Sequence, residues 1–389
     1  MGTERTRVRS PRTMLEQRIQ ERCETFEEFA EFATTFARQH GEPGTLSARH
    51  VKRLAAGHGE SGKPLGQPRP VTARLLERIF GLTVDVLLSP PCGDQASAGE
   101  EDELRAMLRV AARVDGTVLR LLREQLTATR RLDRQLGAIV AHDEVLTKIT
   151  QVTRLMGHSL TPTRRQQLAA LLSELHTLAG WQALDMGKLT ESWRHYSRGS
   201  TIAKEATTSA YDAHTTAGQA FVLIDLGDTS AAAELLAATR AEVDRKTDRL
   251  LRSWLAAAHG ETLAADGQRS ASLCAFDQAA EILPDDATEA DDGPYLALDS
   301  VHLARWRGHA LARVGAPDAI NVLQSALDRL DPTFTRAEAA LHADLATAFI
   351  TTDEQERAQV HVQRAHALAA DIGSARQHRR ITQLRAPIA

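Results

Sequence analysis

The sequence predicts an all-α protein with a small N-terminal cluster of short helices, a long connector helix and a C-terminal array of helix pairs. Three observations predict this fold class. Alanine, leucine and arginine are abundant, only 4% of residues are aromatic and β-branched runs are short, which favours helices over sheets. Apolar residues recur at helical spacing along most of the chain. A pair of helices joined by a short turn also repeats, with 40, 40, 48 and 38 residues between successive turns.

The length and composition set the broad class of the protein. A chain of 389 residues with 42% apolar and 25% charged residues can bury two or three separate cores. No run of about 18 apolar residues is present, and the basic start of the chain lacks the apolar core of a signal peptide. We therefore expect a cytoplasmic protein with no segment that spans a membrane.

Charge is distributed unevenly along the chain. Residues 1–90 carry 14 Lys and Arg against 11 Asp and Glu, a net charge of +3, whereas the whole chain has a net charge of −4. The remaining residues therefore carry −7. A basic head on an acidic body is the pattern expected when only the head approaches an anionic partner such as DNA.

Residues 1–88 are expected to form a compact domain of five short helices. Apolar residues follow a helical period through the first two helices, and Thr25 with Glu28 forms a capping box. A third helix starts at Thr45 or Ser47 and runs through SARHVKRLAA. The segments VTARLLERIFG and TVDVLLSP predict two more helices, each opened by a threonine.

Residues 89–102 have the Pro, Gly, Ser and acidic composition of a linker. Residues 103–160 follow as connector and dimerisation helices. One long helix is expected from Glu103 to Ile139, because its apolar residues step alternately by four and three positions, as in a coiled coil. Two interpretations stay open: the seam joins two chains into a homodimer, or the helix packs on its own neighbours.

Residues 161–389 are predicted to form an array of helix pairs. The turns within the pairs are DMGK, DLGD, ADGQ, RVGAP and TTDE. A small residue seven positions before each turn would let two antiparallel helices approach closely; these residues are Gly180, Ala220, Gly260, Gly308 and Ala346. Because one pair cannot bury its faces alone, the pairs should stack into a curved solenoid.

This array resembles tetratricopeptide repeats. The large apolar residue expected three positions after the small one is present at Leu223, Leu263, Leu311 and Phe349. The alanine expected near the start of the second helix is present at Ala232, Ala319 and Ala358. The units are longer than the standard repeat, and their first helices lack the usual tryptophan in the first turn, so the resemblance is to a divergent form.

The head is similar to the Cro/repressor-like helix-turn-helix family. TFEEFA corresponds to the second helix of that family, TLSARHVKRLAAG to the recognition helix and RPVTARLLERIFGLTVDVLL to the closing pair. The turn before the recognition helix is longer than in the family, and HGESGKPLGQ is an insertion. The whole layout resembles actinobacterial transcriptional regulators with such a head and a repeat body, which implies double-stranded DNA as a partner.

Donor side chains gather on the expected recognition helix. Arg49 and Arg53 are four residues apart and therefore share one face, where they could contact bases and phosphates. A basic N-terminal arm could add phosphate or minor-groove contacts. The predicted DNA-binding residues are Thr45, Ser47, Arg49, His50, Lys52, Arg53, Arg7 and Arg9. The alternative is a solvated helix face with a disordered tail.

The first helix of each pair would turn one side toward the concave face of the solenoid, as in the resembling family. Aromatic side chains at one end and a basic, histidine-bearing stripe at the other could bind a peptide, an acidic small molecule or a protein partner. The alternative is a lining that contacts other parts of the same chain. The residues predicted for this face are Glu174, Trp181, Asp185, His214, Phe221, Asp225, Trp254, Glu261, His302, Arg305, His309 and Arg313.

No motif predicts catalysis, a cofactor or a metal site. Residues 57–64 have the G-x-x-x-x-G-K spacing of a phosphate-binding loop, but Pro64 replaces the hydroxyl residue that would bind the metal. The histidines lack the H-E-x-x-H spacing of a zinc enzyme. We therefore predict a DNA-binding transcriptional regulator whose repeat domain senses a ligand or partner. The alternative is a repeat scaffold whose head does not bind DNA.

Overall fold

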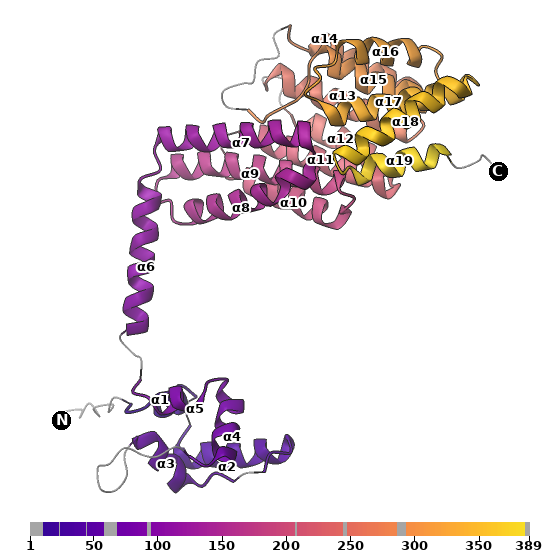
Figure 1. Cartoon of the computed structure of the whole chain (residues 1–389). Helices are drawn as coiled ribbons and strands as arrows, with labels where there is room; N and C mark the ends of the chain where they lie inside the picture. The colour runs from indigo at the N-terminus through magenta and orange to yellow at the C-terminus, as the bar shows by residue number, and fades with distance from the viewer. Residues whose placement is uncertain are drawn as a thin grey trace. The chain divides into compact units, whose positions relative to one another are not determined.

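The computed structural model describes residues 11–22, 24–43, 45–57, 68–91, 95–206, 208–243, 247–285 and 293–385. Over these residues it contains nineteen helices and no strand, so the predicted all-α class is confirmed (Figure 1). The chain divides into two compact units at residues 105 and 106. We call the helices α1 to α5 the head and residues 106–389 the repeat body.

The head consists of α1 (Met14–Glu21), α2 (Phe26–Gln39), α3 (Ala48–Ala56), α4 (Pro70–Phe80) and α5 (Val84–Leu88). These are the five short helices that the sequence predicts. The capping box is present, since the Thr25 hydroxyl accepts from the Glu28 amide and the Glu28 carboxylate accepts from the Thr25 amide. The expected threonine start is wrong for α4, which begins at Pro70, a residue whose fixed φ suits the first helical position.

The long connector helix predicted over 103–139 is wrong, because the chain forms three helices in its place. These are α6 (Gln95–Ala112), α7 (Gly116–Leu136) and α8 (Ala138–Gly157). Asp115, which the heptad places in the seam, caps α7 by accepting a hydrogen bond of 2.9 Å from the Val118 amide. The predicted linker over 89–102 is also helical from Gln95 onward.

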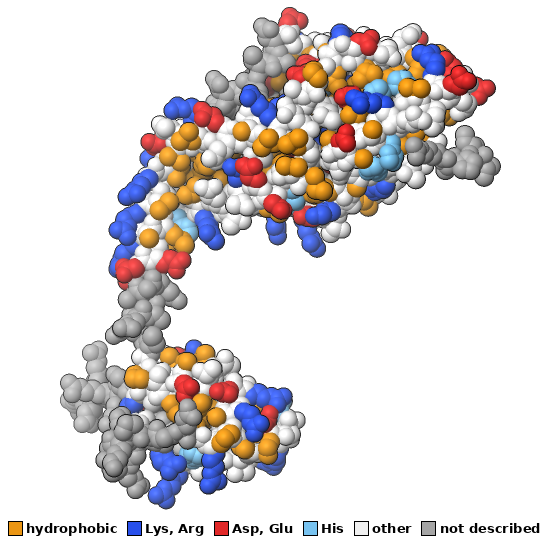
Figure 2. Space-filling view, in the orientation of Figure 1, with side chains coloured by type: hydrophobic (Ala, Val, Ile, Leu, Met, Phe, Trp, Pro, Cys, Tyr) orange, Lys and Arg blue, Asp and Glu red, His pale blue; other side chains and the backbone are white. Residues whose placement is uncertain are grey.

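The buried side of α7 overlaps the predicted seam only in part. Leu119, Leu126, Thr129 and Asp133 are buried, and of these only Thr129 is a seam position. The two leucines share a core with α8 and α9 (Pro162–Asp185). Seam positions Leu132 and Leu136 are exposed, and Figure 2 shows hydrophobic side chains on the surface of this region. Helix α7 therefore packs on its own neighbours, and the homodimer stays a prediction.

The array consists of five antiparallel helix pairs followed by the single helix α19 (Ala375–Arg385). The pairs are α9 with α10 (Leu189–Ala203), α11 (Ala210–Leu226) with α12 (Thr229–Glu242), α13 (Arg249–Ala265) with α14 (Arg269–Ile282), α15 (Ser300–Arg313) with α16 (Ala319–Arg329), and α17 (Thr335–Thr351) with α18 (Gln355–Asp371). Each predicted turn separates the two helices of a pair. The repeat body thus has a tetratricopeptide-like helical-repeat fold.

The predicted small residues lie where the two helices of a pair touch. A Cβ added at Gly260 would come within 2.8 Å of the Phe276 ring, and one added at Gly308 within 2.6 Å of Leu323. Because real Cβ atoms do not approach so closely, these glycines let the paired helices pack at their observed separation.

The turns within the pairs share one backbone feature. Gly187, Gly227, Gly267 and Gly315 have φ between 65° and 89°, and Asp353 holds the same place in the last pair with φ of 63°. Asp353→Gly should therefore raise the free energy of unfolding by about 0.5 kcal/mol, because glycine removes the left-handed strain of an L residue. Thermal unfolding checks this, and a fall in Tm would contradict it.

The two ends of the array meet, so the repeat body closes on itself. Helix α7 packs against both α9 and α17, while α19 packs against α9, α17 and α18. The first and last helix pairs are therefore linked on two sides. This closure turns the concave face of the solenoid into the wall of a cavity.

Candidate ligand-binding site

A cavity of about 660 Å³ lies inside the closed repeat body. Its wall comes from the inner sides of α7, α9, α11, α13, α15, α17 and α19, with Tyr196 of α10 and the segment before α15. Eleven of the twelve residues predicted for the concave face line this cavity: Glu174, Trp181, His214, Phe221, Asp225, Trp254, Glu261, His302, Arg305, His309 and Arg313. The twelfth, Asp185, is buried just behind the wall, where it binds a lining arginine.

One side of the cavity is aromatic. The rings of Phe221, Trp254 and Trp306 have centroids 6.0 to 6.3 Å apart and lie at steep angles to one another. Trp181 adds an edge contact to Phe221 at 6.5 Å. Such edge-to-face packing stabilises aromatic clusters, and it gives this side a large apolar surface.

A buried arginine joins the first and last helix pairs. Arg336 of α17 donates to Asp133 of α7 at 2.8 Å and to Asp185 of α9 at 2.9 Å. Burial lowers the pKa of Arg336, but the two carboxylates raise it more, so its net shift is upward. Gln182 donates to Asp133 and Ser374 to Asp185, so both carboxylates have further partners.

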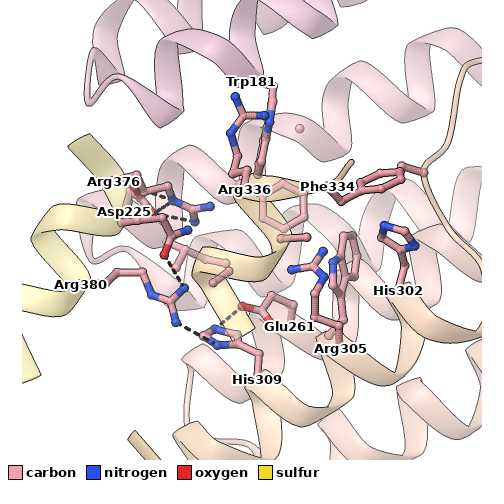
Figure 3. Close-up of a pocket in the computed structure, with 18 of the residues that line it drawn as sticks. Trp181, Asp225, Glu261, His302, Arg305, His309, Phe334, Arg336, Arg376 and Arg380 are labelled. Atoms are coloured by element: carbon pink, nitrogen blue, oxygen red, sulfur yellow. Dashed lines mark hydrogen bonds and ion pairs between the residues drawn. The ribbon is translucent and has the colours of Figure 1, made fainter. Parts of the chain in front are cut away.

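Helix α19 is held in place by two further arginines (Figure 3). Arg376 donates to both oxygens of Asp225 on α11, at 2.8 to 3.0 Å. Arg380 pairs with Asp344 on α17. One short helix therefore reaches the second and the fifth helix pair, and its side chains complete the wall of the cavity.

His309 lies between two carboxylates. Its Nδ1 is 2.6 Å from Asp344 and its Nε2 is 2.8 Å from Glu261. Since carboxylates only accept hydrogen bonds, this geometry fits the protonated imidazolium. Burial lowers the pKa of His309, but Asp344 and Glu261 raise it more, so its pKa lies above the usual value.

Arg305 differs from Arg336, Arg376 and Arg380, which pair with carboxylates. It points into the cavity from α15 (Figure 3), and among the described residues its Nε has no hydrogen-bond partner. Burial lowers its pKa to about 10. In the same lining, Nε of Arg134, Oε2 of Glu261 and Nε2 of His302 are also buried without a partner from the described part of the chain. Unsatisfied polar atoms in one cavity mark a site that a ligand can complete.

The lining carries more positive than negative charge. Eight arginines line the cavity with five carboxylates, although the whole chain is net negative. Within the described residues, histidine, cysteine and carboxylate side chains form no cluster suited to a metal ion. The chemistry of the wall therefore suits an acidic organic ligand with an apolar part.

Sequence reasoning missed the residues that close the cavity. These are Arg130, Asp133 and Arg134 of α7, Tyr295 and Phe334 of two loops, Arg336 and Asp344 of α17, and Arg376, Arg379 and Arg380 of α19. Only the density of arginines near the C-terminus gave a signal. It did not indicate which helix they would face.

The buried His176 and the half-buried His214 make the stability of the repeat body depend on pH. Burial lowers the pKa of His214 to about 3 and that of His176 to about 4, so both are neutral in the folded state at neutral pH. As the pH falls from about 6.5 to about 4, the unfolded chain takes up protons that the folded chain does not. We expect the free energy of unfolding to fall over this range by about 1–3 kcal/mol for each histidine.

Urea unfolding followed by tryptophan fluorescence at pH 7 and pH 5 measures this effect. His214→Phe keeps a ring against Trp254, which lies 4.7 Å away, and should make the pH dependence weaker. Equal unfolding free energies at both pH values would contradict the account.

The predicted DNA-binding residues of the head lie on or beside α3. Thr45, Ser47, Arg49, Lys52 and Arg53 are exposed, and His50 is half-buried. Ser47 caps α3 and accepts from the His50 amide at 3.3 Å, so Thr45 precedes the helix. Lys52 forms an ion pair of 2.5 Å with Glu27 of α2. Two predicted DNA-binding residues, Arg7 and Arg9, lie outside the described residues. The same holds for the segment with phosphate-loop spacing at 57–64, except for its first residue.

Comparison with known proteins adds little to this description. No family model and no curated protein matches the chain. Among solved structures, one similar chain is a Q17M form of a putative kinesin light chain of Podosopora anserina with nearly identical TPR-like repeats. The two chains share 17% sequence identity, and their superposition has a TM-score of 0.35. The match covers 53% of this chain and 97% of the kinesin light chain structure. The P58(IPK) TPR domain shares 12% sequence identity with this chain at a TM-score of 0.24, and the match covers 96% of this chain and 93% of that domain. The repeat assignment rests on the helix pairs themselves.

Proposed function

We propose that the chain is a binding protein whose repeat body takes an acidic ligand into its cavity. The observation that carries this proposal is the set of eight arginines in a wall that also holds an aromatic cluster. Arginine gives directional, charge-assisted hydrogen bonds to carboxylates and phosphates, and aromatic rings supply apolar contact. The repeat body would then act as a sensor or adaptor.

The geometry of His309 favours binding over catalysis. Both ring nitrogens face carboxylates, at 2.6 and 2.8 Å, so neither is free to accept a proton from a substrate. The repeat fold also presents its inner face in the way that recognition proteins use. For the described helices, none is both long and apolar enough to cross a bilayer.

A thermal-shift screen of the full chain tests the proposal. Acidic compounds and acidic peptides should raise the Tm of the repeat body, whereas basic compounds of similar size should not, because a ligand stabilises the state that binds it. All four tryptophans lie between residues 181 and 306, so tryptophan fluorescence reports on this unit alone. Shifts from basic compounds only would overturn the proposal.

A second candidate function is DNA binding by the head. The observation that favours it is the exposed basic side of α3, with Arg49, Lys52 and Arg53, together with the resemblance of the head to the Cro/repressor-like family. Under this proposal the chain is a transcriptional regulator, and a homodimer would place two heads on successive half-sites. The adaptor reading instead has a head that does not touch DNA.

Fluorescence anisotropy with a labelled duplex separates these readings. A regulator should bind with an affinity that falls steeply as salt rises from 50 to 200 mM, because phosphate contacts release counterions. The double variant Arg49→Ala with Arg53→Ala should weaken binding, and Arg18→Ala serves as a control, since Arg18 is an exposed α1 residue paired with Glu21. Equal binding by both variants would contradict a role of α3 in DNA recognition. Absence of binding at both salt concentrations would favour the adaptor function.

A further inference from the structure

We propose that the ligand of the cavity is a small aromatic anion whose carboxylate or phosphate pairs with Arg305 and whose ring lies against the aromatic cluster. The cluster consists of Phe221, Trp254 and Trp306. This inference rests on the proposed function and narrows it, from any acidic ligand to one class of small molecule.

Arg305 is a lining arginine whose Nε lacks a hydrogen-bond partner among the described residues. Four other lining arginines are held by carboxylates: Arg130 by Glu174 at 2.7 Å, Arg336 by Asp133 and Asp185, Arg376 by Asp225 and Arg380 by Asp344. Arg134 donates to the Tyr295 hydroxyl, and its Nε also lacks a partner among the described residues. No carboxylate of the described residues forms an ion pair with Arg305, and its Nε is buried without a hydrogen bond. A buried guanidinium nitrogen without a partner is costly, and an incoming oxyanion would satisfy it.

Three carboxylates and one further arginine act on the charge of Arg305. Glu261, Asp344 and Asp299 act on it as negative neighbours and Arg380 as a positive one. Glu261 and Asp344 are engaged by His309, whose geometry fits the cation, and Asp299 is engaged by His302 at 2.9 Å. These carboxylates have other partners and none forms an ion pair with Arg305, although Oε2 of Glu261 is left without one.

The aromatic cluster forms part of the same lining as Arg305. Trp306 follows Arg305 directly on α15, and its ring is 6.0 Å from those of Phe221 and Trp254. Flat apolar groups pack well against rings that meet edge to face. A ligand that contacts both features must therefore carry an anion next to a flat apolar body.

Closure of the repeat body favours a small molecule over a macromolecule. The Arg336 pairs join α7 to α17, and the Arg376 and Arg380 pairs hold α19 between the second and fifth helix pairs. The volume of about 660 Å³ lies within the range of about 300–1,000 Å³ that is usual for small-molecule sites.

Isothermal titration of the full chain with 2-naphthoate tests the inference. We expect binding of one molecule per chain, with 2-naphthamide as the neutral compound of equal shape and inorganic phosphate as the anion without a ring. Both should bind at least about tenfold more weakly, because each lacks one half of the recognised chemistry.

Variants on α15 provide the matched comparison. Arg305→Met should weaken 2-naphthoate binding by at least about tenfold and leave 2-naphthamide binding unchanged. Arg307→Met, two residues along the same helix, removes an arginine that pairs with Asp277 outside the cavity and should change affinity by less than about twofold. Equal binding of 2-naphthoate by the two variants would overturn the inference.

A second readout needs no ligand. Arg305→Met should raise the Tm of the repeat body by about 2–4 °C, because it removes a buried cation without a partner, and a fall in Tm would show that Arg305 is structural. Failure of this inference can be told apart from failure of the proposed function. If hexaglutamate binds and 2-naphthoate does not, the small aromatic anion is wrong while an acidic ligand stands. If no acid binds, both are wrong.

Discussion

Replacing Arg336 with alanine is expected to lower the free energy of unfolding of the repeat body by about 3–5 kcal/mol. Arg336 is only 8% exposed and pairs with Asp133 and Asp185, which are 3% and 1% exposed. Without the guanidinium, two buried carboxylates would face each other with no cation. Because these pairs also join α7 and α9 to α17, the variant should separate the two ends of the helix array.

Urea unfolding followed by tryptophan fluorescence measures this loss. Arg364→Ala is the matched control, since Arg364 is a half-exposed arginine of the same unit that pairs with Glu338 at 2.8 Å. Surface pairs of this kind contribute about 0–1 kcal/mol. A similar effect from both variants would contradict the role given to the buried triad.

Gly137→Ala is the second replacement with a large expected effect, about 3 kcal/mol or more of lost unfolding free energy. Gly137 joins α7 to α8 with φ of 85° and ψ of 170°, a region that is essentially restricted to glycine. A Cβ there would come within 2.0 Å of the Ile372 carbonyl oxygen, which lies just after α18. The methyl group would therefore push the two ends of the array apart.

Gly227→Ala separates strain from crowding in this prediction. Gly227 also has positive φ, 89°, but nothing lies within 4 Å of its added Cβ. It should therefore lose only about 1 kcal/mol, the cost of the left-handed backbone. If both variants unfold at the same urea concentration, the contact between Gly137 and Ile372 does not hold the two ends of the helix array together.

Local signals were enough to predict the helix pairs. The turns carry a residue with positive φ at a fixed place, and the paired helices meet at glycines such as Gly260 and Gly308. Both features are set by residues close in sequence. The prediction of one long connector helix was wrong for a related reason. The same spacing of apolar residues fits a coiled coil and a helix buried in its own unit, and only the cap at Asp115 distinguishes them.

The candidate site was predictable on one side only. The inner faces of the first helices follow from the repeat, and Trp254, Arg305 and His309 accordingly line the cavity. Helices α7 and α19 lie outside the repeat pattern, so the contacts of Arg336 with Asp133 and of Arg376 with Asp225 had no signal in the sequence. Such pairs depend on the curvature of the whole array, which is a sum over many small packing angles.

The most direct test of the central claim, that the cavity of the repeat body is the binding site, is amide hydrogen exchange of the full chain. It compares the free protein with protein saturated by the acidic compound that raises Tm most. Binding should slow exchange in the cavity-lining helices α13, α15, α17 and α19 and leave the outer helices α14 and α16 unchanged. Protection confined to the outer helices or to the head would contradict the account.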